Sequence, residues 1–260
     1  MVVIAFIGSI QHDVEKDSIR RLVEAIKADA ACDCIVTCNA NGLFATASKL
    51  NEQLEILFDS GIDLVMVGEQ AISRSCCRAV FAKAEWPVIK AINLPGSNNT
   101  NSIKQISHGD NTMWFISCAD GSGKVPIDLP HLKLDEFFKN KKDNSAVIIN
   151  ESGSDLKYLK ALAYRYSGFA YPVLILGSST GEATRAEQLF SDKCLIQYDA
   201  GSVVTEKTIC GIDPELWWKK SINRRPLTLL PKWGSLKCDY TLIWLSTEKI
   251  EKYCVKSVRI

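Results

Sequence analysis

Apolar runs alternate with amphipathic segments in the first third of the chain. The runs at residues 2–7, 32–38, 62–67 and 87–92 have the length and the composition of buried strands. Between them, apolar residues recur at helical spacing. We predict one helix with Asp17 or Ser18 as its N-cap and a second that is capped by Ser48 and ended by Gly61 at its C′ position. A third helix is predicted to extend to about Ala84. Strands separated by helices in this way form a parallel sheet with both faces covered.

The pattern changes after residues 94–101, a polar stretch rich in Asn. His108-Gly109-Asp110-Asn111 is a turn sequence between two strand-like runs and predicts an antiparallel hairpin. Later strands are expected at 145–150, 172–177, 194–201, 240–246 and 252–260, with helices at 134–140 and 156–166. We find no repeat or linker. The sequence therefore predicts one domain over residues 1–260, in which two mixed sheets face each other and helices flank them: an α/β/β/α sandwich.

Composition excludes several classes of protein. A hydrophobic content of 47% in 260 residues is ample for a large core, and a net charge of +1 gives no field that attracts nucleic acid or an anionic membrane. The first apolar run is too short to span a membrane and lacks the flanks of a signal peptide. We therefore expect a cytoplasmic protein that binds neither nucleic acid nor membrane.

The ten cysteines include no CxxC pair. Such pairs are typical of zinc sites, and dense disulfide frameworks occur in shorter chains with smaller cores. Cys32, Cys34 and Cys38 would alternate onto one face of the second predicted strand, which is compatible with a cluster of thiolates. We favour the simpler interpretation that the cysteines are reduced and pack as small hydrophobic residues.

Polar residues follow five of the predicted strands. In an α/β sheet, ligands bind where the carboxyl ends of the strands meet. Gly8, Gly68 and Gly177 lie at three of these ends, where glycine permits a sharp turn or a close backbone approach. The polar stretches are Gly8-Ser9-Ile10, residues 38–42, Gly68-Glu69-Gln70, Asn150-Glu151-Ser152 and residues 177–181. They predict a cleft, although βα turns favour the same residue types without any function.

The order of these strand ends resembles that in the YmdB-type calcineurin-like metallophosphoesterases, bacterial enzymes associated with hydrolysis of cyclic-nucleotide phosphodiesters. FIGSI resembles the first strand of that family with its G-D-I turn, and LFDSGIDLVMVGEQ is similar to L-F-D-A-G-V-D-V-I-T-L-G-N-H. CNANG, AINLPGSN, LILGSSTGEAT and the final VKSVRI resemble further family segments in the same order. The resemblance covers about 250 residues and implies a metallophosphoesterase-like fold.

The resemblance does not extend to the metal ligands. Ser9 stands where the family has its first Asp, Cys38 where it has Glu, and only the following Asn is kept, as Asn39. Glu69-Gln70 replaces the family's Asn-His, whose His is expected to act as an acid. The two histidines of G-T-H-T-H fall on Ser179 and Gly181, and the remaining family His falls within 150–153. A two-metal phosphodiesterase needs these groups to bind its ions and to generate hydroxide. We therefore expect no cofactor.

A rearranged site is the alternative. His12 lies three residues beyond Ser9, whereas His108 and His131 lie in loops and are interpreted as surface residues. His12, Cys38, Asn39, Glu69 and Glu151 would have to form that site together. Asn39 and Glu69 are the candidate metal ligands, and a divalent Mn, Fe or Mg ion would be the cofactor. Without imidazoles, such a centre would be poorly matched to transition metals.

Three hypotheses for the function follow. The first is a divergent family member with a degenerate metal centre, retained for binding or interaction, with a weakly held phosphate or nucleotide as its ligand. The second is an active metal-dependent phosphodiesterase that uses the rearranged site. The third is a structural or assembly subunit, including a homo-oligomer, that associates through Trp217-Trp218 or Trp233.

Overall fold

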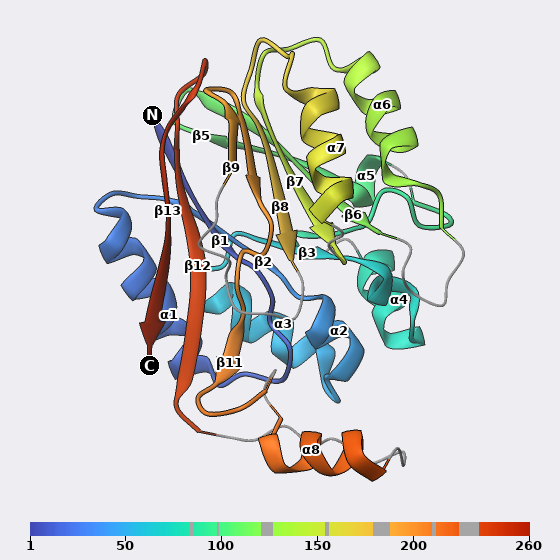
Figure 1. The fold of residues 1–260 in the computed structure, drawn as a ribbon, viewed down its shortest axis with the longest axis vertical. Helices are drawn as coiled ribbons and strands as arrows, with labels where there is room; N and C mark the ends of the chain where they lie inside the picture. Colours follow the sequence, from blue (N-terminus) through green and yellow to red (C-terminus); the bar gives the residue numbers. More distant parts are fainter. Residues whose placement is uncertain are drawn as a thin grey trace.

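Two sheets lie face to face, and helices cover the outer face of each (Figure 1). The computed structural model describes residues 1–83, 86–97, 99–120, 127–153, 156–178, 188–209, 212–223 and 234–260. Within these ranges the chain forms the predicted α/β/β/α sandwich. Both sheets are mixed, because each combines parallel strands that are joined through helices with antiparallel strands at its sides.

The first sheet has the strand order β11-β12-β1-β2-β3-β4, with β13 also paired to β12. Strands β1 to β4 are parallel, and β12 runs antiparallel to β1, β11 and β13. Its strands are β1 (Val2–Ile7), β2 (Ile35–Asn39), β3 (Leu64–Val67), β4 (Val88–Lys90), β11 (Val203–Thr205), β12 (Leu236–Leu245) and β13 (Ile250–Arg259). The connections contain α1 (Lys16–Ala30), α2 (Asn41–Thr46), α3 (Leu50–Asp59), the 3-10 turn η1 (Glu69–Ile72) and α4 (Ser75–Lys83).

The second sheet has the order β5-β6-β7-β8-β10-β9. The pairs β6-β7, β7-β8 and β8-β10 are parallel, and the two outermost pairs are antiparallel. Its strands are β5 (Ile103–His108), β6 (Asn111–Ala119), β7 (Ala146–Ser152), β8 (Val173–Ser178), β9 (Gln188–Ser191) and β10 (Cys194–Gln197). The helices of this half are α5 (Asn99–Ser102), α6 (Pro130–Asn140) and α7 (Leu156–Tyr166), and α8 (Pro214–Asn223) follows β11.

Alternate residues of each central strand face opposite layers. In β1, Ile4 and Phe6 face the second sheet, whereas Ala5 and Ile7 pack under the helices of the first. One apolar cluster therefore fills the space between the sheets. A second cluster lies between the first sheet and its helices, and a third lies between the second sheet and its helices. Burial on both faces explains why these strands are apolar along their whole length.

Several predicted boundaries differ from those in the structure. The run 32–38 forms a strand only from Ile35 onward, so of the three cysteines only Cys38 lies in the strand. Cys34 is buried just before it, and Cys32 is exposed. The predicted caps are also wrong, since Glu15 and Lys49 precede α1 and α3 and neither makes a side-chain cap. Gly61 follows the C-cap of α3 with φ +96°, as predicted.

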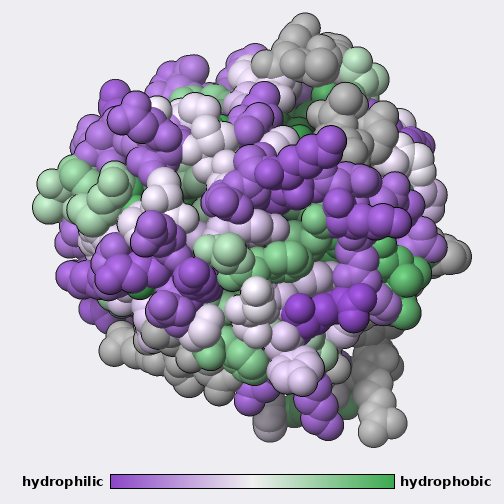
Figure 2. Space-filling model, turned by 90° about the horizontal axis from the view of Figure 1, so that it is seen from above, coloured by the Kyte–Doolittle hydropathy of each residue, from purple (hydrophilic) through white to green (hydrophobic). Residues whose placement is uncertain are grey.

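The hairpin is confirmed, because His108 pairs with Asn111 across the two-residue turn. No helix in the described part of the chain is long and apolar enough to cross a membrane. Viewed from above, the molecule presents a largely hydrophilic face with some hydrophobic groups exposed near its centre (Figure 2).

Candidate functional site

A cleft lies where the carboxyl ends of strands from both sheets meet. Its cavity has a volume of about 320 Å³. The first sheet and the segments after its strands supply Ser9, Gln11, Asn39, Asn41, Glu69 and Gln70, and the second sheet supplies Ser152 and Ser178. Polar groups from strand ends that are far apart in the sequence thus converge on one cavity, in the place where α/β folds bind ligands.

Asn39, at the end of β2, is held in one orientation. Its Oδ1 accepts the backbone N–H of Asn41 at 2.8 Å. Its Nδ2 donates to Ser178 Oγ at 2.7 Å and to Asn150 Oδ1 at 3.2 Å. Because a backbone N–H can only donate, the first bond decides which end of the amide is oxygen. The end directed toward the second sheet is therefore a donor.

The network continues across the second sheet to the first. Ser178 Oγ donates to Asn150 Oδ1 at 2.8 Å, and Asn150 Nδ2 donates to Ser117 Oγ at 3.1 Å. Ser117 Oγ in turn donates to the backbone oxygen of Val67, at the end of β3, at 3.0 Å. Asn39, Ser117, Asn150 and Ser178 are all buried. A buried polar network of this kind fixes the relative position of the strands that carry it.

Glu69, the first residue of η1, is the carboxylate among the described residues that line the cleft. Its Oε1 accepts the side-chain amides of Asn41 at 3.1 Å and of Gln70 at 3.3 Å. Asn41 Oδ1 accepts the backbone N–H of Gln70 at 3.0 Å, which fixes the orientation of the Asn41 amide as well. The Glu69 carboxylate therefore already has neutral hydrogen-bond donors at one of its two oxygens.

Ser9 and Ser152 face the cleft with their hydroxyl groups. Gln11 Nε2 donates to Ser9 Oγ at 2.5 Å, so the Ser9 oxygen acts as an acceptor and its O–H has no acceptor among the described residues. Ser152, at the end of β7, lines the same cavity. The two hydroxyls are available as donors to a small ligand.

The three glycines at the strand ends permit close approaches, as predicted. A Cβ atom on Gly8 would lie 2.1 Å from the backbone oxygen of Gly201, and one on Gly177 would lie 2.1 Å from the backbone oxygen of Tyr198. A Cβ on Gly68 would lie 2.5 Å from the side chain of Ser152. The ends of β1 and β8 are therefore packed against backbone that leaves no room for a side chain, and the end of β3 is packed against the side chain of Ser152.

The structure does not bring Cys38 or Glu151 to the cleft. Cys38 alternates with Asn39, so its side chain packs into the apolar cluster under the helices, and burial raises the pKa of its thiol. Glu151 alternates with Asn150 and Ser152, which places its fully buried side chain on the helical face of β7. Burial of the Tyr158 hydroxyl in α7 raises the pKa of that group to about 12, and the charge of Glu151 adds to this effect.

The remaining candidates divide into three groups. His12 is half-buried and does not line the described cavity. Ser9, Asn39, Glu69 and Gln70 do line it. Ser179 and Gly181 lie outside the described residues, so their predicted place in the site stays a prediction.

Gln11 and Ser117 were not predicted. Gln11 follows the first strand by four residues, in a stretch with no periodicity that would show where its side chain points. Ser117 carried a usable signal, because it is a polar residue within the apolar run of β6. Its neighbour across the parallel pair is Asn150, another buried polar residue.

Comparison with solved structures identifies the fold. The chain superimposes on a Thermus thermophilus protein described as hypothetical, with a TM-score of 0.84, 19% identity and 99% coverage of both chains. A Mycoplasma pneumoniae structure described as a novel phosphatase superimposes with a TM-score of 0.81 and 14% identity, and the match covers 100% of this chain and 93% of that chain. An NAD nucleotidase of Haemophilus influenzae superimposes with a TM-score of 0.53 and 12% identity, and the match covers 99% of this chain and 55% of that chain. The fold is that of the calcineurin-like metallophosphoesterases.

The sequence places the chain more narrowly within this class. The profile of the YmdB-like protein family matches residues 5–257. The chain is therefore a member of the YmdB-like family, as the resemblance of its strand ends implied. No curated protein matches the sequence.

The described residues of the cleft do not fit a two-metal centre. Such a centre needs bridging carboxylates and imidazoles, whereas the described cleft presents one carboxylate, Glu69, and the nitrogen end of Asn39. No three His, Cys, Asp or Glu side chains within the described ranges are placed to hold a metal ion together.

Proposed function

We propose that this chain is a non-catalytic member of the YmdB-like family, whose cleft binds a small phosphate-bearing ligand weakly through neutral hydrogen bonds. The orientation of Asn39 is the observation that supports this proposal most strongly. The one residue that matches the family's ligand set directs its N–H₂ group toward Ser178 and Asn150, where it bridges the two sheets. A donor in this position serves the fold and has no use as a metal ligand.

The alternative, an active phosphodiesterase with a rearranged site, has less support. It requires Cys38 and Glu151 beside Asn39 and Glu69, but both side chains point to the helical layers. The thiol of Cys38 is also fully buried, and burial disfavours the thiolate that a metal would bind. Metal content distinguishes the two functions.

Protein purified from cells grown with added manganese is expected to contain well below two equivalents of Mn, Fe and Zn, because the described residues of the cleft include neither the imidazoles nor the second carboxylate of a dinuclear site. Elemental analysis after gel filtration measures this. Glu69→Gln is the control, and any trace of metal should be the same in that variant. Two tightly held equivalents in the unmodified protein, lost in Glu69→Gln, would establish the alternative.

Inorganic phosphate is expected to bind in the millimolar range, with a binding free energy of about −4 kcal/mol, because the donors among the described residues of the cleft are uncharged. Titration of the protein with phosphate, followed by isotope-edited NMR, measures this affinity. Ser9→Ala and Ser152→Ala should each weaken binding severalfold, since each removes a hydroxyl donor. Ser107→Ala is the control, because Ser107 lies in β5 away from the cleft. Binding that all three variants retain unchanged would contradict the proposed ligand site.

A further inference from the structure

A second, larger cavity lies between α6 and the β5 edge of the second sheet. Its volume is about 770 Å³, more than twice that of the cleft, and its walls share no residue with the cleft. It lies among Ile92, Ile103, Trp114, Phe137 and the segment that leads from α6 to β7. This volume falls within the range of about 300–1,000 Å³ that is common for small-molecule sites.

The floor of the cavity is apolar and partly aromatic. Ile103 in β5 and Trp114 in β6 lie on the helical face of the sheet, in the same apolar layer as Ile92 and Phe137. The rings of Trp114 and Phe137 meet edge to face, with centroids 5.7 Å apart. Both aromatic side chains remain partly exposed in this cavity. An exposed aromatic pair at the bottom of a cavity favours a flat, apolar group as its occupant.

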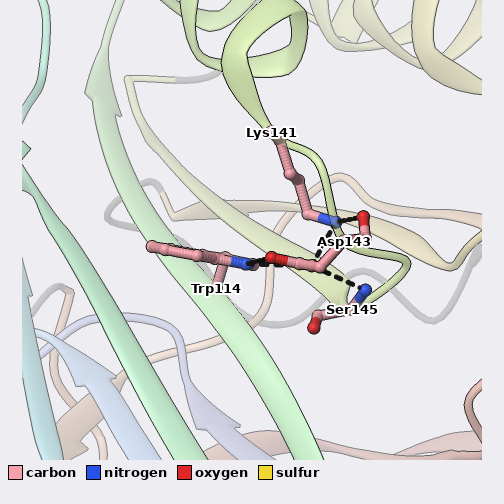
Figure 3. A network of polar contacts seen from close by, with 4 residues as sticks. All are labelled: Trp114, Lys141, Asp143 and Ser145. Carbon is pink, nitrogen blue, oxygen red and sulfur yellow. Dashed lines mark hydrogen bonds and ion pairs between the residues drawn. The ribbon is translucent and has the colours of Figure 1, made fainter.

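Polar contacts hold the tryptophan in place (Figure 3). Trp114 Nε1 donates to Asp143 Oδ2 at 3.1 Å, and the Lys141 ammonium donates to Asp143 Oδ1 at 2.8 Å. The Lys141 side chain is fully buried, and its Nζ lies 3.7 Å from the ring centroid of Tyr171. Burial tends to raise the pKa of Asp143, but hydrogen bonds from Lys141 and Ser145 outweigh it and lower that pKa to about 2. The indole is thus positioned before any ligand arrives.

Among the described residues at the rim of the cavity, one cationic side chain has no acidic partner. Lys141 is neutralised by Asp143, and Lys133 lies 3.7 Å from Glu136. Lys142 also lines the cavity, and it has no ion-pair partner within the described part of the chain. The exposed amide of Asn140 lies beside it on the rim. One available ammonium above an aromatic floor matches a ligand with one negative charge.

We infer that the cavity between α6 and β5 binds a small aromatic anion, whose ring lies against Trp114 and Phe137 and whose carboxylate, sulfonate or phosphate group contacts Lys142. This site is separate from the cleft and does not depend on the function proposed for the cleft. The test uses two fluorescent probes with the same aromatic body: anilinonaphthalene sulfonate, which carries one negative charge, and the neutral N-phenylnaphthylamine.

The native protein is expected to bind one equivalent of the sulfonate saturably. Lys142→Gln should raise the dissociation constant of the sulfonate roughly two- to fivefold, as for a partly exposed ion pair, and should leave that of the neutral probe unchanged. Lys139→Gln is the matched control, because Lys139 is exposed in the last turn of α6 and does not line the cavity. It should change neither dissociation constant.

A third variant tests the location of the site without altering the core. Asn140→Trp places a large side chain at an exposed rim position and should weaken binding of both probes by about tenfold, which corresponds to roughly 1.4 kcal/mol. Trp218→Ser, which changes an exposed residue of α8, should have no effect. The inference is overturned if the native protein shows no saturable binding, if Asn140→Trp binds like the unmodified protein while its circular dichroism is native, or if Lys142→Gln and Lys139→Gln behave alike.

Discussion

Addition of Mn²⁺ to the purified protein is expected to produce no hydrolysis of bis(p-nitrophenyl) phosphate or of cyclic nucleotides. In a metallophosphoesterase the ions lower the pKa of a bound water to about 7 and so supply hydroxide at neutral pH. In the described cleft, Asn39 presents an amide nitrogen and the oxygen Oε1 of Glu69 accepts two amide N–H groups. Nothing in this set can generate the nucleophile, so turnover should not exceed the uncatalysed rate in a release assay for p-nitrophenol.

Three variants make this experiment decisive. Ser9→Asp restores the carboxylate that the family carries at the first strand, and it should remain inactive because several other ligand positions also differ. Glu69→Gln shows whether any trace of turnover belongs to the cleft, since activity from a contaminant would be unchanged. Metal-dependent hydrolysis by the unmodified protein that disappears in Glu69→Gln or Asn39→Ala would show that the chain is an enzyme.

Replacing Gly8 by alanine is expected to lower the free energy of unfolding by about 3 kcal/mol or more. The added Cβ would lie 2.1 Å from the backbone oxygen of Gly201 and 2.7 Å from its nitrogen, so a backbone segment would have to move. That segment is held on both sides. Ala200 N–H donates to the Gly177 oxygen at 3.0 Å, and Val203 N–H donates to the Ser9 oxygen at 2.7 Å. Urea denaturation followed by circular dichroism measures the loss.

Gly168 provides the matched control for Gly8. An added Cβ at Gly168 meets no atom within 4 Å, so Gly168→Ala should change the stability by no more than about 0.5 kcal/mol. Equal stability of the two variants would mean that the segment around Gly201 yields easily, and that the close approach at the end of β1 does not constrain the fold.

The sequence predicts the layers of this fold because its strands are buried on both faces. The apolar run of β1 predicts a strand that is buried on both faces. The helical spacing of Ile19, Leu22, Val23 and Ile26 predicts a helix with one buried side. The elements without such a pattern could not be predicted. α2 has the sequence NGLFAT, which is too short to show a helical period, and β11 has three residues.

The sequence does not show which side chains of a strand end point into the cleft. A slip of one residue in the pairing of a strand exchanges its two faces. Cys38 lies beside Asn39 in the sequence, and this order alone does not show which of the two side chains faces the cleft. The structure does so, because β2 directs Asn39 to the cleft and Cys38 to the helical layer. Contacts such as Asn39 with Ser178 join separate strands, and no local pattern encodes them.

The polar bridge between the two sheets also has a consequence for the order of folding. Asn39 lies 111 residues before Asn150 and 139 residues before Ser178. Contacts between such distant parts of a chain close long loops and form late. During synthesis the first strands of the cleft emerge well before β7 and β8, and neither part holds the bridge by itself. Occupancy of the cleft by phosphate would therefore report that both sheets have assembled, and would serve as a probe of completed folding.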